Sequence, residues 1–303
     1  MGWTGRLELA YRRTDAIGAA STAGSLTDVR ADARADALPA ADVRTVVHDR
    51  HDGPLRVLKS LYPEAPAICH SVLVHPPGGI VGGDTLAVDI DVAAGAHALI
   101  TTPGATRFYR SLGEPALQAV QARVADGARL EWLPLETLAY SGCLAESRMR
   151  FELAPGAEMM GWDVLALGLP AADLAFERGV YTSSIDQPSR WLERARIAAG
   201  DTLLLDSPLG WAGHRVLGTM WFAAGRALAT SRRDALLDVA RECVDAQPAG
   251  VSAGATAVDD AVVVLRVLAA RVEPAMALMA ATWARWRETA WALPGRAPRI
   301  WRT

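Results

Sequence analysis

The sequence has little lysine, little cysteine and no long apolar run. Among its 31 basic residues only Lys59 is a lysine, so the other 30 are arginines. These 31 basic residues stand against 34 acidic ones, and the net charge of −3 argues against a nucleic-acid-binding protein with a basic face. The most apolar run, residues 261–270, is short and contains Arg266. We therefore expect neither a nucleic acid nor a membrane among its partners.

The three cysteines indicate the compartment. Cys69, Cys143 and Cys243 include no CxxC pair, and their odd number prevents full pairing. Such a sparse set is typical of a reducing compartment. The first six residues have no apolar signal core, and Arg6 stands where a myristoylation motif requires Ser or Thr. We expect a cytoplasmic protein.

Common catalytic and metal-binding motifs are absent from the sequence. It has no GxSxG nucleophile elbow, no HExxH or HxxxH pair, and no histidine close to Cys143 in the sequence. Each of the six histidines is therefore expected to be an ordinary core or surface residue, and a closed metal site is not predicted. A weak site built from one or two carboxylates and a histidine stays open, because sequence spacing does not exclude it.

The hydrophobic pattern predicts a β-rich protein. Hydrophobic residues make up 51% of the chain and charged residues 21%, which excludes a disordered protein. Residues 5–11 and 84–92 alternate with period two, as half-buried strands do. Residues 15–41 are rich in Ala, Ser, Thr and Asp with little periodicity, and we interpret them as a mobile insert or loop.

A repeated glycine signal divides the β-rich part of the chain. Strand-like segments end near Gly95, Gly127, Gly156 and Gly200, at intervals of 32, 29 and 44 residues. At each glycine we expect positive φ and a reversal of the chain into a new strand. The strands expected after the four glycines are 97–102, 129–133, 158–167 and 202–205. The pattern predicts stacked strands over about 43–225, but it does not separate a helicoidal stack from a hairpin-rich sandwich.

Helical periodicity is found only near the C-terminus. Ser231 is expected to cap a helix over 234–246, and Pro274 opens a second helix that Pro294 ends. Between them, residues 260–270 are β-branched and are expected to form a strand. Along the second helix, apolar side chains recur every three or four residues: Met276, Met279, Trp283, Trp286 and Ala290. This stripe is either core or a docking face.

The predicted fold is therefore mainly β, a helicoidal or stacked β-strand architecture with helices near the C-terminus. A chain of 303 residues is long enough for two domains, although one large β-rich unit of this size is also common. We expect a single domain over 1–303, with a β-rich body at 43–225 and a helix-containing part at 231–303.

Two acidic residues stand in unusual sequence contexts. Asp84 ends a loop with two prolines and four glycines, residues 75–84, between two predicted strands. A phosphate-binding loop would need Lys and Ser or Thr followed by a helix, whereas here a carboxylate and a strand follow. The loop is either a tight structural turn that needs positive φ twice or a functional loop that exposes Asp84 to a ligand or partner. Glu136 follows a strand and a Pro turn among apolar residues, so it either faces solvent or is kept for function.

Several motifs in this part of the chain follow one another in a distinctive order. Residues 53–57 read GPLRV, 62–64 read YPE, 75–84 read HPPGGIVGGD, 99–111 read LITTPGATRFYRS, 130–137 read LEWLPLET and 161–162 read GW. Together they resemble the urease accessory protein D family, also called UreD or UreH. The order and spacing agree over about residues 3–222. The signal is specific because the HPPGGxxGGD and TTPGATxxYRS segments occur in the right order and register.

The resemblance implies a non-enzymatic role in the delivery of nickel to urease. Members of the family act as scaffolds in complex with the accessory F protein and the GTPase accessory G protein, and they contact apo-urease. Their helicoidal, mainly β fold with helices near the C-terminus agrees with the pattern above. The resemblance further implies that nickel passes through the interior, with Asp84 and Glu136 as transient waypoints and no permanent cofactor. Weak oxygen ligands suit that role, because a closed thiolate site would retain the ion.

The motif residues that the resemblance places in the partner-contacting loops form one group. They are His75, Pro76, Pro77, Gly78, Gly79, Gly82, Gly83, Thr101, Thr102, Tyr109 and Arg110.

The sequence departs from the family pattern at four positions. The usual Arg after the GPLRV segment is displaced or replaced by Lys59. Leu169 and Leu174 stand where the family has the Arg and Glu of a GRPxxGE segment, and Leu135 replaces the usual Gln before Glu136. The missing Glu at position 174 leaves open one nickel waypoint that the family pattern implies. Asp173 and Glu177 are the alternatives, but a one-residue shift in a strand changes the face on which a side chain lies. Two other hypotheses stay open: a hydrolase that uses Asp84 and Glu136 as a carboxylate pair, and a protein-binding module without a metal role.

Overall fold

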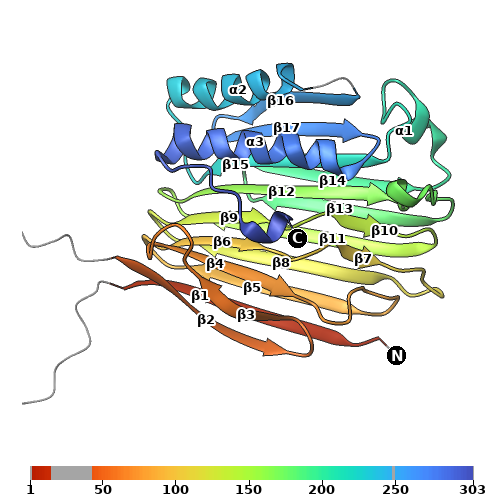
Figure 1. Cartoon of the computed structure of the whole chain (residues 1–303), viewed down its shortest axis with the longest axis horizontal. Helices are drawn as coiled ribbons and strands as arrows, with labels where there is room; N and C mark the ends of the chain where they lie inside the picture. Colours follow the sequence, from red (N-terminus) through yellow and green to blue (C-terminus); the bar gives the residue numbers. More distant parts are fainter. Residues whose placement is uncertain (1, 15–42, 248–249, 303) are drawn as a thin grey trace, which may run out of the picture.

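The chain folds into two stacked β-sheets with helices against one of them (Figure 1). The computed structural model describes residues 2–14, 43–247 and 250–302. The loop predicted at 15–41 lies outside the described residues. No helix within these ranges is both long and apolar enough to cross a membrane.

In the described residues, seven strands form the first sheet, in the order β14-β13-β11-β8-β5-β1-β2. Their bounds are β1 (Thr4–Thr14), β2 (Arg44–Asp52), β5 (Thr85–Val92), β8 (Ala116–Val124), β11 (Cys143–Leu153), β13 (Gly179–Gln187) and β14 (Trp191–Ala198). The second sheet has the order β16-β17-β15-β12-β9-β6-β4-β3, β10 pairs with β12 beside this path, and β7 pairs with β10. Its strands are β3 (Arg56–Leu61), β4 (Ile68–Val74), β6 (His97–Thr101), β7 (Thr106–Phe108), β9 (Arg129–Leu133), β10 (Thr137–Ala139), β12 (Glu158–Leu167), β15 (Val216–Ala224), β16 (Val251–Asp259) and β17 (Val262–Ala269).

Between β4 and β13 the chain crosses repeatedly from one sheet to the other. Strands β4, β6, β9 and β12 lie in the second sheet, and β5, β8, β11 and β13 lie in the first. Neighbours within each set pair in parallel, which a simple hairpin cannot produce. Each circuit of the chain therefore adds one level to a β-solenoid. The helicoidal prediction is confirmed, and the hairpin-rich sandwich is wrong for this part of the chain.

The glycine turns connect the two sheets. Gly95 and Gly127 have φ of 69° and 68°, so the predicted left-handed conformation is confirmed at these two positions. The prediction is wrong at Gly156 and Gly200, which do not have positive φ. At Gly156 close approach is the reason for glycine, because a Cβ there would lie 2.4 Å from a carboxylate oxygen of Asp126. The backbone N–H of Gly156 donates a 2.6 Å hydrogen bond to that oxygen.

Two apolar layers hold the fold together. The first lies between the sheets and includes Leu9, Ile90 and Phe151. The second lies between the outer face of the second sheet and the helices α2 (Thr230–Asp245) and α3 (Val272–Trp291), which Figure 1 shows along that face. Three large side chains of the predicted stripe, Met279, Trp283 and Trp286, are fully or almost fully buried in this second layer. These stripe residues therefore form core, and the docking-face alternative is wrong for them.

Two local predictions are wrong. Residues 202–205 form part of the helix α1 (Thr202–Asp206), because the Asp201 carboxylate accepts the Leu204 N–H and caps a helical turn. Ser231 does not cap α2, which begins one residue earlier. Its N-cap residue is Ala229, which contributes only its backbone carbonyl. Two short 3-10 helices complete the chain: η1 (Pro170–Ala172) and η2 (Arg299–Arg302).

Candidate functional site

The loop between β4 and β5 crosses from the second sheet to the first through two tight turns. The Gly78 N–H donates to the His75 carbonyl at 2.8 Å, and the Asp84 N–H donates to the Val81 carbonyl at 3.0 Å. Gly78 has φ of 77° and Gly83 has φ of 91°, so the predicted need for two left-handed residues is confirmed. The loop therefore follows a hydrogen-bonded path from one sheet to the other.

Asp84 organises this loop from inside. Its side chain is 2% exposed, so the interpretation that exposes it to a ligand or partner is wrong. One carboxylate oxygen accepts the Trp3 N–H at 3.2 Å, and the other accepts the Val81 N–H at 3.1 Å. Asp84 thus fixes both the loop and the N-terminal strand β1.

Glu136 lies in a neighbouring segment of the same end of the solenoid. Its backbone carbonyl accepts the Thr106 N–H at 2.9 Å, at the point where β7 and β10 begin to pair. Ile80 of the glycine loop bonds to the other side of β7, through the carbonyl of Arg107 and the N–H of Tyr109. The Glu136 side chain is half-buried and forms no hydrogen bond or ion pair with the described residues. The structure therefore places the Asp84 and Glu136 segments on either side of β7.

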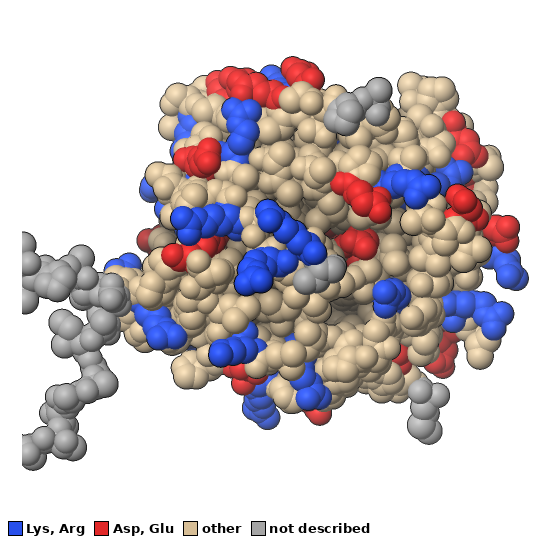
Figure 2. Space-filling model, in the orientation of Figure 1, with Lys and Arg blue, Asp and Glu red and all other residues tan. Residues whose placement is uncertain are grey.

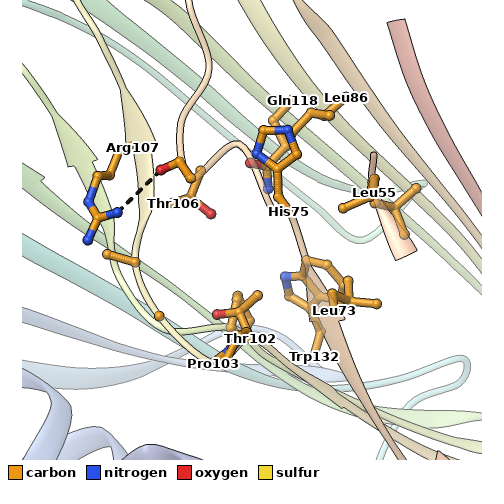
Figure 3. Close-up of a pocket in the computed structure, with 15 residues that line it drawn as sticks. Leu55, Leu73, His75, Leu86, Thr102, Pro103, Thr106, Arg107, Gln118 and Trp132 are labelled. Carbon is orange, nitrogen blue, oxygen red and sulfur yellow. Dashed lines mark hydrogen bonds between the residues drawn. The ribbon is translucent and has the colours of Figure 1, made fainter. Parts of the chain in front are cut away.

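A cavity of about 230 Å³ lies between the two sheets beside this loop (Figure 3). Its apolar walls come from Leu55, Leu73, Leu86 and Val88, and its polar groups come from His75, Thr102, Thr106, Arg107, Gln118 and Trp132. The His75 Nε2 and the Trp132 Nε1 are buried there and have no hydrogen-bond partner among the described residues. Burial lowers the pKa of His75, although nearby Asp84 opposes the shift. His75 is therefore a neutral imidazole at physiological pH.

The other motif residues lie in two places, beside the loop and against the C-terminal segment. Tyr109 packs edge-on against Tyr140 next to the loop, and Arg110 is exposed. Thr101 points toward the C-terminus, where its hydroxyl donates to the Leu133 carbonyl at 2.6 Å and accepts the Trp301 indole N–H at 2.8 Å. The motif residues thus include some that lie beside the glycine loop and one, Thr101, that contacts the C-terminal segment. The remaining members lie in the glycine loop or at the edge of the cavity: Pro76, Pro77, Gly79, Gly82, Gly83 and Thr102.

A buried charge cluster that the sequence did not predict lies under α3. Arg287 of α3 is fully buried and contacts Glu64 at 2.9 Å and Glu131 at 3.4 Å. His70 bonds to Glu64 at 2.9 Å, and His97 bonds to Glu131 at 2.7 Å. One buried cation therefore lies between two buried carboxylates, each of which has its own histidine.

The environment of this cluster sets the protonation of its members. Burial lowers the pKa of His97, against the opposing effect of Glu131. Burial alone would raise the pKa of Glu64, but hydrogen bonds from His70 and Arg287 outweigh it, so this pKa is lowered. One clue to the cluster was present in the sequence. Arg287 follows Trp283 by four residues and so lies on the apolar face of the helix, where a charge must be paired.

A further carboxylate, Asp163 of β12, faces the layer between the sheets. Burial raises its pKa to about 6, and nearby Glu193 adds to the shift. Within residues 2–14, 43–247 and 250–302, however, no three His, Cys, Asp or Glu side chains are grouped closely enough to hold a metal ion. The described residues thus present separate oxygen and imidazole groups along the interior.

The two leucines that depart from the family pattern lie at the opposite ends of a small turn. Leu169 and Leu174 form an isolated antiparallel bridge around η1, and Leu174 is 58% exposed. The acidic residues nearest in sequence, Asp173 and Glu177, are exposed.

Comparison with known proteins matches residues 29–302 to the family described as UreD urease accessory protein. The chain belongs to the UreD family. It is 58% identical to the urease accessory protein UreD of Leptothrix cholodnii over 303 residues, which cover both chains completely. It is 59% identical to UreD of Polaromonas naphthalenivorans over 258 residues, 85% of this chain and 94% of the relative. UreD of Methylibium petroleiphilum is 56% identical over the full length of both chains.

Proposed function

We propose that this protein is a urease maturation factor, a scaffold without catalytic activity of its own that works on apo-urease. Its UreD relatives are named urease accessory proteins, and the match extends over almost the whole chain. The geometry of Asp84 supports a scaffold over a hydrolase, because both of its carboxylate oxygens accept backbone N–H groups. A carboxylate held in this way serves the loop and is poorly placed to act as an acid or base with Glu136.

The proposal includes protein partners: apo-urease, an F-type accessory protein and a GTPase of the G type. The surface supports such contacts. Leu112, Leu203 and Leu209 are 95%, 79% and 99% exposed, and large exposed apolar side chains favour interfaces. Exposed arginines at positions 296, 299 and 302 lie near the C-terminus, on a face where Figure 2 shows several basic side chains together. Basic side chains there suit an acidic partner surface.

The proposal also includes nickel as a transient substrate that moves through the interior. Glu136 is the best candidate waypoint, because its half-buried carboxylate has no partner among the described residues. Asp84 stays the other proposed waypoint, although both of its oxygens accept backbone N–H groups, and Asp163 offers a further oxygen ligand inside the solenoid. Single carboxylates and imidazoles bind such an ion weakly enough to release it, which delivery requires.

The test replaces Glu136 by Gln, which keeps the size of the side chain and removes its charge. The variant is co-expressed with the urease operon, and the nickel bound per urease active site is measured after purification. We expect about a tenfold loss of nickel loading, equal to about 1.4 kcal/mol of lost ligand interaction, with normal co-purification of the scaffold complex. The control is Asp238→Asn, which changes an exposed carboxylate on α2 and should load nickel normally. Normal loading by Glu136→Gln would remove Glu136 from the nickel path.

A further inference from the structure

The cavity beside the glycine loop is lined by a buried hydrogen-bond donor, the indole N–H of Trp132, that has no acceptor among the described residues. Trp132 is 2% exposed, and its Nε1 has no hydrogen-bond partner among the described residues. Figure 3 shows this nitrogen on the edge of the indole that faces His75 across the cavity. A buried N–H without an acceptor costs free energy, so such groups in proteins almost always have a partner. Since an indole nitrogen can only donate, the partner it lacks is an acceptor.

The positively charged side chain of Arg107 lines the same cavity. Arg107 is half-buried, and one of its N–H groups donates to the Gly78 carbonyl at 3.3 Å. Arg107 forms no ion pair with a carboxylate in the described part of the chain. The guanidinium group has five N–H donors, so it retains several for an anion.

Other polar groups of the cavity add donors. The Thr102 oxygen accepts the Leu135 N–H at 2.9 Å, and its own hydroxyl hydrogen is therefore available to donate. Asp84 is close enough to His75 to influence its pKa, but its two oxygens accept backbone N–H groups. Trp132, Arg107 and Thr102 therefore contribute donors to the lining, beside Gln118, whose amide both donates and accepts.

The remaining walls are apolar. Leu55, Leu73, Leu86 and Val88 line the cavity next to Trp132. A volume of about 230 Å³ leaves room for several carbon atoms, because a dry cavity of about 150 Å³ already admits benzene. A buried indole N–H next to the leucines, with a cation across the cavity, suits a small ligand with an anionic head and an apolar tail.

The same composition disfavours a divalent cation. An indole N–H and a guanidinium have no lone pair to donate to a metal, and the positive charge of Arg107 would repel it. Among the lining residues only His75 carries a good ligand atom for such an ion. This cavity therefore has a chemistry of its own, distinct from that of the carboxylates proposed as nickel waypoints.

We propose that the cavity binds a short-chain monocarboxylate. The Trp132 Nε1–H donates a hydrogen bond to the ligand's carboxylate, the positive charge of Arg107 on the other side of the cavity attracts that carboxylate, and the alkyl chain packs against the leucines. This inference does not rest on the proposed function in urease maturation, and either can fail without the other.

The test uses the indole proton of Trp132 as its reporter. The full-length chain is labelled with 15N at its tryptophan indoles, and Trp132→Phe identifies the signal by its disappearance while it keeps an aromatic ring in place. Sodium butyrate is then titrated at constant ionic strength. We expect a saturable downfield shift of this one signal with a Kd of about 1 mM, the affinity ordinary for a ligand of so few atoms.

Two comparisons make the result decisive. Butyramide, which has the same shape without the charge, and sodium chloride should leave the signal almost unmoved. Arg107→Met should weaken butyrate binding about tenfold, whereas Arg110→Met, which changes an exposed arginine three residues away, should not. No saturable shift with butyrate, an equal shift with butyramide, or an unchanged affinity of Arg107→Met would each overturn the proposal.

Discussion

Arg287 is the residue on which the packing of α3 depends most directly. Its guanidinium is fully buried and neutralises Glu64 and Glu131, while Trp283 donates its indole N–H to Glu131 at 2.6 Å. Buried ion pairs add little net stability, because desolvation offsets their attraction. The loss of one partner is costly, however, since the remaining charges stay buried without compensation.

We therefore expect Arg287→Met to lower the free energy of unfolding by about 3–5 kcal/mol. Urea titration followed by fluorescence measures this change. Replacing Glu64 and Glu131 by Gln in the same chain should recover a large part of the loss, because the variant then buries no unpaired charge. Arg285→Met is the matched control, since Arg285 pairs with Glu242 at the surface and should change stability by only about 0–1 kcal/mol. A small effect of Arg287→Met would contradict the role given to the cluster.

The sequence could not predict this cluster because it depends on contacts between distant residues. Arg287 and Glu64 are separated by 223 positions, and only the folded chain brings them together. Glu136 attracted attention as a charge among apolar neighbours, but Glu131, five positions earlier, is the more deeply buried of the two. Because β9 is buried on both faces, the alternation that normally marks an inward residue is missing there.

At the scale of elements, two histidines, a buried one on β6 under α3 and a half-buried one in the glycine loop, make the stability of the fold depend on pH. Burial lowers the pKa of His97 on β6, and burial also lowers that of His75 in the glycine loop. In the unfolded chain both histidines take up protons as the pH falls through their ordinary pKa, whereas in the folded protein they resist it. At these two histidines the unfolded state therefore binds more protons than the folded state. The free energy of unfolding must decrease as the pH is lowered.

We expect the free energy of unfolding to decrease between pH 7.5 and pH 6, by less than about 1 kcal/mol for each histidine. The measurement is a series of urea titrations across this range, in whose lower part Asp163, with its pKa raised to about 6, acts in the opposite sense. His97→Gln should flatten the pH dependence whatever it does to the absolute stability. His48→Gln, which changes an exposed histidine on β2, should leave the slope as it is. An unchanged slope in His97→Gln would contradict this account.

Several strands were predictable because their local patterns were clear, and α1 shows where such patterns fail. Residues 84–92, 97–102, 129–133, 158–167 and 260–270 were expected as strands and correspond closely to β5, β6, β9, β12 and β17. Residues 202–205 were expected as a strand, but a short apolar run fits either a strand or a helix. Asp201 decides the case by capping the first turn.

At the scale of the whole molecule, the arrangement of the strands was harder to foresee than their positions. Gly95 and Gly127 marked turns correctly, yet a glycine turn does not reveal whether the next strand pairs beside the last one or crosses to another sheet. Parallel pairing is nonlocal, so the motif order was more informative than periodicity. It predicted both the helicoidal fold and the family to which the chain belongs.

The central claim is that this chain enables the maturation of urease. The most direct measurement compares urease activity in cells that express the complete urease operon, supplied with nickel, with and without the gene for this chain. We predict that activity without it falls to background while the amount of urease protein stays the same, and that the intact gene restores activity. Equal activity with and without the chain would contradict the claim.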